Sequence, residues 1–200
     1  MAAARAWEEV PDRPPAEIAR ALGQQVELLL AIPEHKVDLP GGGRPTQCDI
    51  FALVRVDEQT CTLAVEAKVD EAFGPTVGEW MVGASSRKAE RMRSICALLG
   101  LRAPAHSLRY QLFHRTAAAV IEAQRFKTER AAMVVQSFSQ EHRWFDDFAA
   151  FAALFGVEAE RGRPLTCILP SGLPLTLGWA TGSSRFAKLE TPCPPPALNA

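Results

Sequence analysis

Apolar and polar positions form their clearest pattern between residues 48 and 69. The segments 48–56 and 61–69 are rich in β-branched and apolar residues, and the polar stretch 57–60 separates them. Two such segments around turn-forming residues predict a β-hairpin. Three charged side chains interrupt these otherwise apolar arms, namely Asp49, Glu66 and Lys68.

The remaining apolar spacing predicts helices and strands on both sides of the hairpin. Before it we expect an irregular lead-in over residues 1–15, a helix from Pro15 to about Ile32 and a short strand at 35–39. After it we expect a helix at 78–99 closed by Gly100, a strand at 108–115 and a helix at 116–126. A central strand at 131–138 follows, and then a helix that ends near 155–156. The last element is a hairpin made by 165–169 and 175–179. This order predicts an α/β fold.

Length and composition agree with one globular domain. The chain has 200 residues, 48% of them hydrophobic, and we assign residues 1–190 to a single domain and 191–200 to a Pro-rich, disordered tail. No apolar run approaches the roughly 20 residues that span a bilayer, and the first residues lack the apolar core of a signal peptide. We therefore expect a cytoplasmic protein that does not enter a membrane.

Charge and cysteine placement argue against two further classes. The formal net charge of −1 disfavours a broadly basic protein that binds nucleic acid without regard to sequence. It does not exclude a local basic groove. The five cysteines are scattered and form no Cys-x-x-Cys pair, which disfavours a zinc site or an iron–sulfur cluster.

The three charges of the hairpin are expected to converge. If the turn is centred between Glu58 and Gln59, Asp49 lies opposite Lys68, and Glu66 lies one diagonal away on the same face. Two carboxylates buried side by side need a proton or a cation, and oxygen ligands suit Mg²⁺ or Mn²⁺. The alternative is a cross-strand salt bridge between Asp49 and Lys68, with Glu66 displaced to the sheet edge.

Three other segments carry candidate chemistry. Residues 40–45 contain three glycines just before Asp49, and they either let the backbone approach a phosphate or an ion or form a flexible connector. The basic cluster at 85–94 is either a solvated helical face or a phosphate-contacting patch. On the expected strand 108–115, Gln111 is a further polar contact because a buried amide needs partners.

The order of elements, with Asp49 on one strand and Glu66-Ala67-Lys68 on the next, resembles the core of the PD-(D/E)xK nuclease superfamily over about residues 16–138. Cys48 departs from that pattern, because it stands where the name-giving Pro precedes the Asp. The chain also looks like an uncharacterised bacterial family assigned to the same superfamily, through the segments 35–37, 39–45, 65–69, 73–76, 110–112, 114–116 and 143–148.

This resemblance implies a restriction-endonuclease-like αβββαβ core with a mixed central sheet flanked by helices, plus a C-terminal helix and hairpin. It also implies that Asp49, Glu66 and the Ala67 carbonyl bind one or two Mg²⁺ (or Mn²⁺) ions. Glu27 would be a further metal ligand, supplied by the first helix.

Lys68 and Gln111 would complete the catalytic set with Asp49 and Glu66. Lys68 would orient the attacking water or stabilise the transition state, and Gln111 would add a polar contact. Two functions are consistent with these residues. One is a magnesium-dependent nuclease that hydrolyses phosphodiester bonds of nucleic acid, DNA rather than RNA. The other is a non-catalytic member of the same fold that binds nucleic acid or a protein partner. A homodimer is a possible assembly.

Overall fold

A computed structural model describes residues 2–23, 25–103 and 106–187 of the chain. Its elements in chain order are α1 (Ala2–Glu8), α2 (Ala16–Leu22), β1 (Val26–Val37), β2 (Thr46–Val56), β3 (Gln59–Lys68), α3 (Val77–Met81), α4 (Ser86–Leu99), α5 (Tyr110–Phe126), β4 (Arg130–Ser137), α6 (Phe145–Ala152), η1 (Ala153–Phe155), β5 (Leu165–Ile168), β6 (Pro174–Thr181) and η2 (Ser184–Phe186). The expected disordered tail at 191–200 lies outside the described residues.

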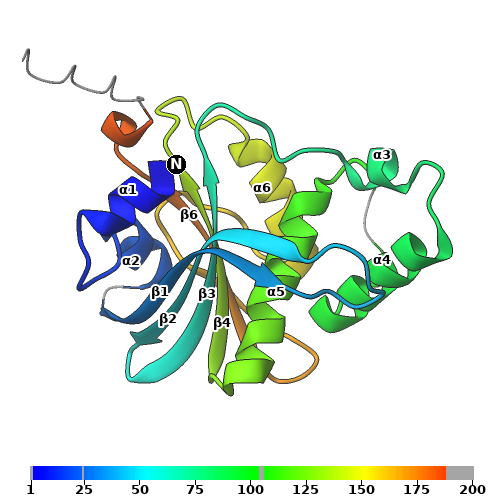
Figure 1. The fold of residues 1–200 in the computed structure, drawn as a ribbon, viewed down its shortest axis with the longest axis horizontal. Coiled ribbons are helices and arrows are strands. Elements are labelled where there is room, and N and C mark those ends of the chain that lie inside the picture. Colours follow the sequence, from blue (N-terminus) through cyan, green and yellow to red (C-terminus); the bar gives the residue numbers. More distant parts are fainter. Residues whose placement is uncertain (1, 24, 104–105, 188–200) are drawn as a thin grey trace, which may run out of the picture.

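The strands form one six-stranded mixed sheet in the order β1-β2-β3-β4-β6-β5. The pairs β1–β2, β2–β3 and β5–β6 are antiparallel, whereas β3–β4 and β4–β6 are parallel. Helices α1 and α2 cover one face of the sheet, and α5, with α4 and α6 beside it, covers the other (Figure 1). The predicted α/β architecture with a mixed sheet flanked by helices is confirmed.

The middle of the sheet is buried on both faces because each face has its own core. On β3, Ala64 packs into the α5 core while Leu63 and Val65 pack against α1 and α2. The predicted central strand at 131–138 corresponds to β4, whose residues after Arg130 are all buried. Strands that are covered on both faces read as continuous apolar runs, which is why this one was predictable.

The central hairpin forms as predicted, but its register differs. Val56 pairs with Gln59, so the turn consists of Asp57 and Glu58, both with positive φ, 47° and 67°. This is the two-residue loop whose twist suits an antiparallel hairpin. The pairing is shifted by an even number of residues from the expected one, so every side chain keeps its predicted face. Asp49 is therefore level with Glu66 and not with Lys68.

Among the N-terminal elements, the strand expected at 35–39 is confirmed in part as the end of β1, whereas the helices were predicted wrongly. The lead-in contains a helix, α1, and the helix expected from Pro15 to Ile32 ends at Leu22. Gly23, at φ 141°, ends it, and residues 26–37 form the long strand β1 against β2. A leucine-rich segment suits a helix by propensity, but pairing along the edge of the sheet decides its structure.

A second correction concerns the segment that follows residue 77. The helix expected at 78–99 is divided into α3 and α4, with Gly83 at φ 61° between them, although Gly100 closes α4 as predicted at φ 72°. The strand expected at 108–115 is the first part of α5. Its buried residues, which include Leu112, Phe113 and Thr116, recur at helical spacing, and that period describes the segment better than alternation does.

The C-terminal prediction agrees with the structure. A helix at Phe145–Ala152 continues into η1 and ends at Gly156, which has a φ of 72°. The final hairpin is formed by β5 and β6, with Leu165 paired to Leu177. No helix among the described residues has the length and apolarity needed to cross a membrane.

Candidate functional site

Glu66 is the centre of a buried polar cluster on the α5 face of β3. The residue is 2% exposed. Its Oε1 accepts hydrogen bonds from Lys68 Nζ at 2.7 Å and from Gln111 Nε2 at 2.6 Å, and its Oε2 accepts one from Arg115 Nε. Each carboxylate oxygen therefore has a donor, and two of the three donors are cations. A buried carboxylate requires such partners, because burying an unpaired charge is costly.

Lys68 is held in one position by its surroundings. It is 4% exposed and lies on the same face of β3 as Glu66. Its ammonium group lies 5.2 Å from the centre of the Phe73 ring, and its carbonyl accepts a hydrogen bond from the Phe138 amide at 2.7 Å. The ammonium group is thus a fixed charge beside the carboxylate.

Asp49 lies where β2 and β3 separate. The ladder between these strands reaches the pair Ile50–Val65, and beyond it Asp49 Oδ2 accepts a hydrogen bond from the Ala67 amide at 2.7 Å. Burial, and next the negative charge of Glu66, raise the pKa of Asp49 to about 6. The amide hydrogen bond and nearby cations lower this pKa by less. Asp49 is therefore a carboxylate whose charge is only weakly stabilised.

The Ala67 carbonyl faces the same gap between the strands. The N–H and C=O groups of one strand residue point to the same neighbouring strand, so the Ala67 carbonyl is directed toward β2, as its amide is. Asp49, Glu66 and this carbonyl are the oxygen donors that the sequence singled out. The structure brings them together at the end of the β2–β3 ladder.

Helix α5 supplies the other side of the cluster. Gln111 and Arg115 are one helical turn apart, so both side chains reach Glu66. Gln111 therefore reaches the site from a helix and not from the expected strand. Arg115 was missed by the sequence analysis. The Gln-x-x-x-Arg spacing would have indicated it if the segment had been interpreted as a helix.

Arg115 also connects Glu66 to a second polar group. It donates from Nη1 to Thr46 Oγ1, and Thr46 Oγ1 lies 2.8 Å from His114 Nδ1. Burial, and next the positive charge of Arg115, lower the pKa of His114 well below 6.5, so the imidazole is neutral at pH 7. The Thr46 hydroxyl accepts from Arg115 and can therefore donate to Nδ1, which leaves the imidazole proton on Nε2.

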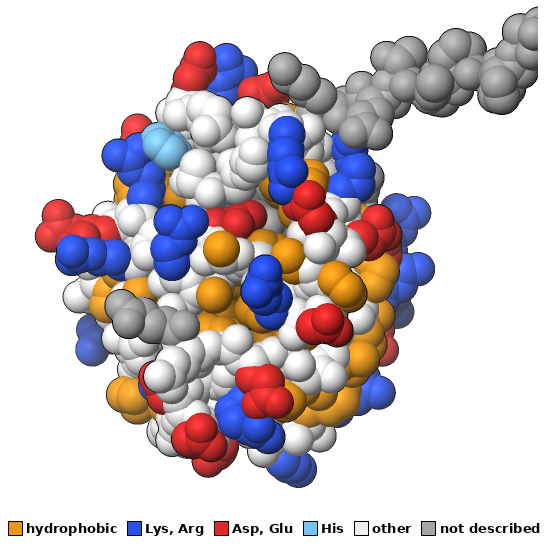
Figure 2. Space-filling model, turned by 90° about the vertical axis from the view of Figure 1, so that its left-hand side faces the viewer, with side chains coloured by type: hydrophobic (Ala, Val, Ile, Leu, Met, Phe, Trp, Pro, Cys, Tyr) orange, Lys and Arg blue, Asp and Glu red, His pale blue; other side chains and the backbone are white. Residues whose placement is uncertain are grey.

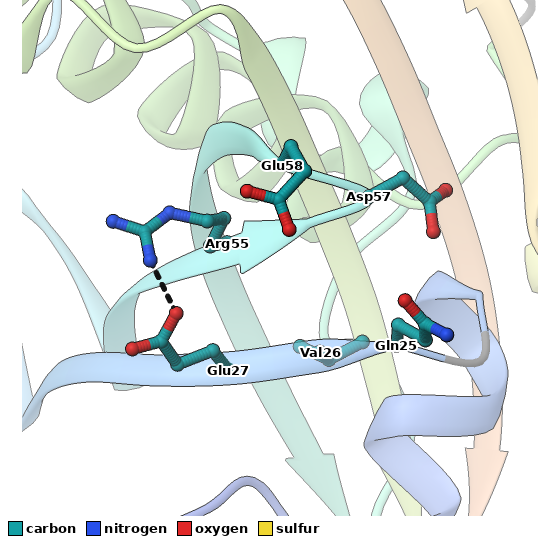
Figure 3. A pocket seen from close by; sticks show the side chains of 6 residues that line it. All are labelled: Gln25, Val26, Glu27, Arg55, Asp57 and Glu58. Atoms are coloured by element: carbon teal, nitrogen blue, oxygen red, sulfur yellow. Dashed lines mark hydrogen bonds and ion pairs between the residues drawn. The ribbon is translucent and has the colours of Figure 1, made fainter.

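Glu27 lies elsewhere, and its assignment as a metal ligand from the first helix is wrong. It is on β1, its side chain is 58% exposed, and it forms an ion pair with Arg55. Figure 3 shows the two side chains near Asp57 and Glu58, at the turn end of the hairpin. Because Glu27 pairs with Arg55, it lies roughly 20 Å along β2 from Asp49.

The glycine-rich segment before β2 is packed against α4. Gly41, at φ 84°, is so close to the helix that a Cβ there would lie 2.8 Å from the Arg91 amide nitrogen. The Arg91 guanidinium donates to the carbonyls of Gly42 and, at 3.0 Å, of Arg44. The glycines therefore allow close approach of backbone to a helix. Whether the segment also contacts a phosphate or an ion stays a prediction.

The oxygen donors of the cluster are of the chemical type that a hard divalent ion prefers. Among the described residues no group of three or more His, Cys, Asp or Glu side chains gathers, so the site offers two carboxylates and one carbonyl. Mg²⁺ commonly uses one or two carboxylates and keeps several waters. Asp49 and the Ala67 carbonyl could bind such an ion directly. Glu66 would have to exchange one of its present hydrogen bonds, because both of its oxygens already accept.

Comparison with known proteins assigns the chain to a family. The profile of a domain of unknown function (DUF6946) matches residues 1–184. The chain belongs to the DUF6946 family. No curated protein and no solved structure matches it. Membership in DUF6946 gives no link to the PD-(D/E)xK superfamily and no activity.

Proposed function

We propose that this DUF6946 protein is a metal-dependent nuclease that hydrolyses phosphodiester bonds of nucleic acid, with DNA preferred to RNA. The proposal is carried by one observation. Asp49, Glu66, the Ala67 carbonyl and Lys68 converge at the point where β2 and β3 separate. The element order supports a restriction-endonuclease-like core, because α2, β1, β2, β3, α5 and β4 follow the order αβββαβ, with α3 and α4 inserted between β3 and α5. A cytoplasmic location belongs to the same proposal.

Each residue of the cluster has a role that follows from its contacts. A Mg²⁺ or Mn²⁺ ion bound by Asp49, Glu66 and the Ala67 carbonyl would lower the pKa of a water and offset charge on the phosphate. Lys68, held beside Glu66, would place a compact positive charge near the phosphate, where negative charge develops. Gln111 and Arg115 hold the two oxygens of Glu66 and thereby fix its orientation.

A non-catalytic role is the second candidate, and a specific observation favours it. Without a metal, the charge and the hydrogen-bonding capacity of Glu66 are already satisfied, because it accepts hydrogen bonds from Lys68, Gln111 and Arg115. Satisfied buried networks of this kind also occur as structural elements. In that case the fold would bind nucleic acid or a protein partner without cleaving it.

Binding of nucleic acid must rely on local contacts. The net charge is −1. On the face shown in Figure 2, acidic and basic side chains are interspersed and do not separate by sign. A surface of this kind does not attract a polyanion over long distances. The contacts that hold a nucleic acid would therefore be confined to the neighbourhood of the site.

A cleavage assay with a matched control tests the nuclease. We expect the wild type to cut single- or double-stranded DNA in Mg²⁺ or Mn²⁺ and to lose all activity in chelator. Lys68→Met keeps the apolar stem beside Phe73 but removes the charge, so turnover should fall by about 10²-fold or more. Lys36→Ala, an exposed lysine on β1, should cut as the wild type does.

The melting temperatures of the two variants show whether a loss of turnover comes from the missing side chain or from unfolding of the protein. Equal turnover by the wild type and Lys68→Met would contradict the role of Lys68. If the folded wild type cuts neither DNA nor RNA with either metal, the non-catalytic candidate replaces the nuclease.

A further inference from the structure

A polar cavity of about 350 Å³ lies beside the Glu66 cluster. Its polar lining includes Arg44, Gln47, Arg91, Gln111, His114 and Arg115. Within the described part of the chain, Asp and Glu are absent from the lining. Three guanidinium groups around one small cavity create an environment that favours an anion.

The cavity and the candidate active site share a wall. Gln111 and Arg115 line the cavity and also donate to the Glu66 carboxylate. A ligand in the cavity would therefore be separated from Glu66 by the thickness of these two side chains. No other described residues of the cavity contact Glu66 by a hydrogen bond.

Two of the three arginines keep their charge available for a ligand. Arg115 is paired with Glu66, whereas neither Arg44 nor Arg91 forms an ion pair with a described residue. Arg91 donates to the neutral carbonyls of Gly42 and Arg44, which hold it in place without cancelling its charge. Such preorganisation lowers the entropic cost of binding an anion.

His114 adds a neutral donor to the same cavity. Its imidazole is uncharged at pH 7, and Thr46 Oγ1, which accepts from Arg115, can donate to Nδ1, so that Nε2 is the nitrogen that can carry the proton. Tyr110 lies in the same wall, stacked on Trp80 with ring centroids 3.8 Å apart. Burial raises the pKa of its hydroxyl and the neighbouring Arg91 charge lowers it by less, so Tyr110 lies beside one of the arginines that line the cavity.

We propose that this cavity is a phosphate-binding subsite, which holds a phosphate of the nucleic acid next to the one positioned at Asp49 and Glu66. The preference for a phosphate follows from the lining alone, whereas the assignment to nucleic acid rests on the proposed function. Arg44 is the residue whose substitution tests the cavity most specifically. It is exposed, it lines the cavity, and its side chain makes no contact with the Glu66 cluster. The phosphate can be a backbone group or the terminal group of a strand.

Binding is measured on the full chain in chelator by NMR, through the amide signals of Thr46, Gln47 and His114. The probes are inorganic phosphate and two DNA oligonucleotides of one sequence, with and without a 5′-phosphate. Arg44→Gln is compared with Arg87→Gln, which removes an exposed arginine one turn before Arg91 that does not line the cavity. We expect saturable shifts for the wild type and Arg87→Gln, and roughly tenfold weaker binding for Arg44→Gln.

The outcomes show whether the cavity binds phosphate and whether that phosphate is a terminal or a backbone group. Tighter binding of the 5′-phosphorylated strand assigns the subsite to a terminal phosphate, and equal binding assigns it to the backbone. Absence of saturable shifts with all three probes, or equal weakening by both substitutions, overturns the proposal. If the protein binds phosphate but cuts no nucleic acid, the proposal of a phosphate subsite stands and the proposed nuclease activity is wrong. If it cuts nucleic acid with metal but does not bind phosphate, the nuclease activity stands and the subsite is wrong.

Discussion

Asp49 and Glu66 differ in how well their charges are stabilised. Glu66 is bonded to two cations and an amide, whereas Asp49 receives one backbone hydrogen bond. Burial and the charge of Glu66 raise the pKa of Asp49 from 3.8 to about 6. A group whose pKa is higher in the folded state destabilises the fold when it ionises. The contribution of Asp49 to the stability of the metal-free protein should therefore be fully present below about pH 4 and be lost as pH rises through 6.

Replacement of Asp49 by Asn should relieve this cost. At pH 7.5 in chelator we expect Asp49→Asn to be more stable than the wild type by about 1–3 kcal/mol, because each pKa unit corresponds to about 1.4 kcal/mol. The advantage should disappear near pH 4, where the wild-type carboxyl is protonated. Urea unfolding at both pH values measures it, with the exposed Asp12→Asn as the control. A variant that is less stable than the wild type at pH 7.5 would show that the Asp49 carboxylate supports the fold.

The site residues were predictable to different degrees. Asp49, Glu66 and Lys68 could be placed together because side-chain alternation along a hairpin survives an even shift of register. Glu27 could not, since its position depended on a helix that ends before it. Arg115 needed a correct assignment of α5, because a helical spacing of four residues brings it and Gln111 to one carboxylate.

At the scale of elements, the buried strands and the edge strand β5 were predictable, whereas the edge strand β1 was expected only over residues 35–39. Strands β3 and β4 are covered on both faces, so their composition reflects their structure. Strand β1 is stabilised by a partner distant in sequence, and its leucines fit a helix equally well by local pattern. The hairpin register depended on which two residues of the polar stretch 57–60 adopt positive φ. Asp57 and Glu58 do, although the polar stretch alone did not distinguish them from Glu58 and Gln59.

Glycine substitution at the turn tests this register directly. Glu58 has a φ of 67°, so Glu58→Gly should stabilise the protein by about 0.5–1 kcal/mol. Gln59 is paired with Val56 in the ladder, so Gln59→Gly should destabilise it by a similar amount. Chemical denaturation of the two variants gives the comparison. The opposite order of stabilities would favour a turn centred between Glu58 and Gln59.

At the scale of the molecule, the sheet separates two cores and presents its polar cluster to only one of them. Glu66 and Lys68 lie on the α5 side of β3, and α5 joins them to the arginine-lined cavity. Asp49 and the Ala67 carbonyl occupy the gap at the end of the β2–β3 ladder. The proposed chemistry therefore depends on one requirement, that this gap binds a divalent ion.

Calorimetric titration of Mn²⁺ into the full chain measures this requirement. We expect saturable binding by the wild type and by Asp12→Asn at pH 7.5, and no binding by Asp49→Asn. Because the ion requires the ionised form of Asp49, whose pKa is about 6, affinity at pH 5 should be about tenfold weaker than at pH 7.5. Absence of binding by the wild type, or the same affinity in Asp49→Asn, would contradict a metal site at Asp49 and Glu66.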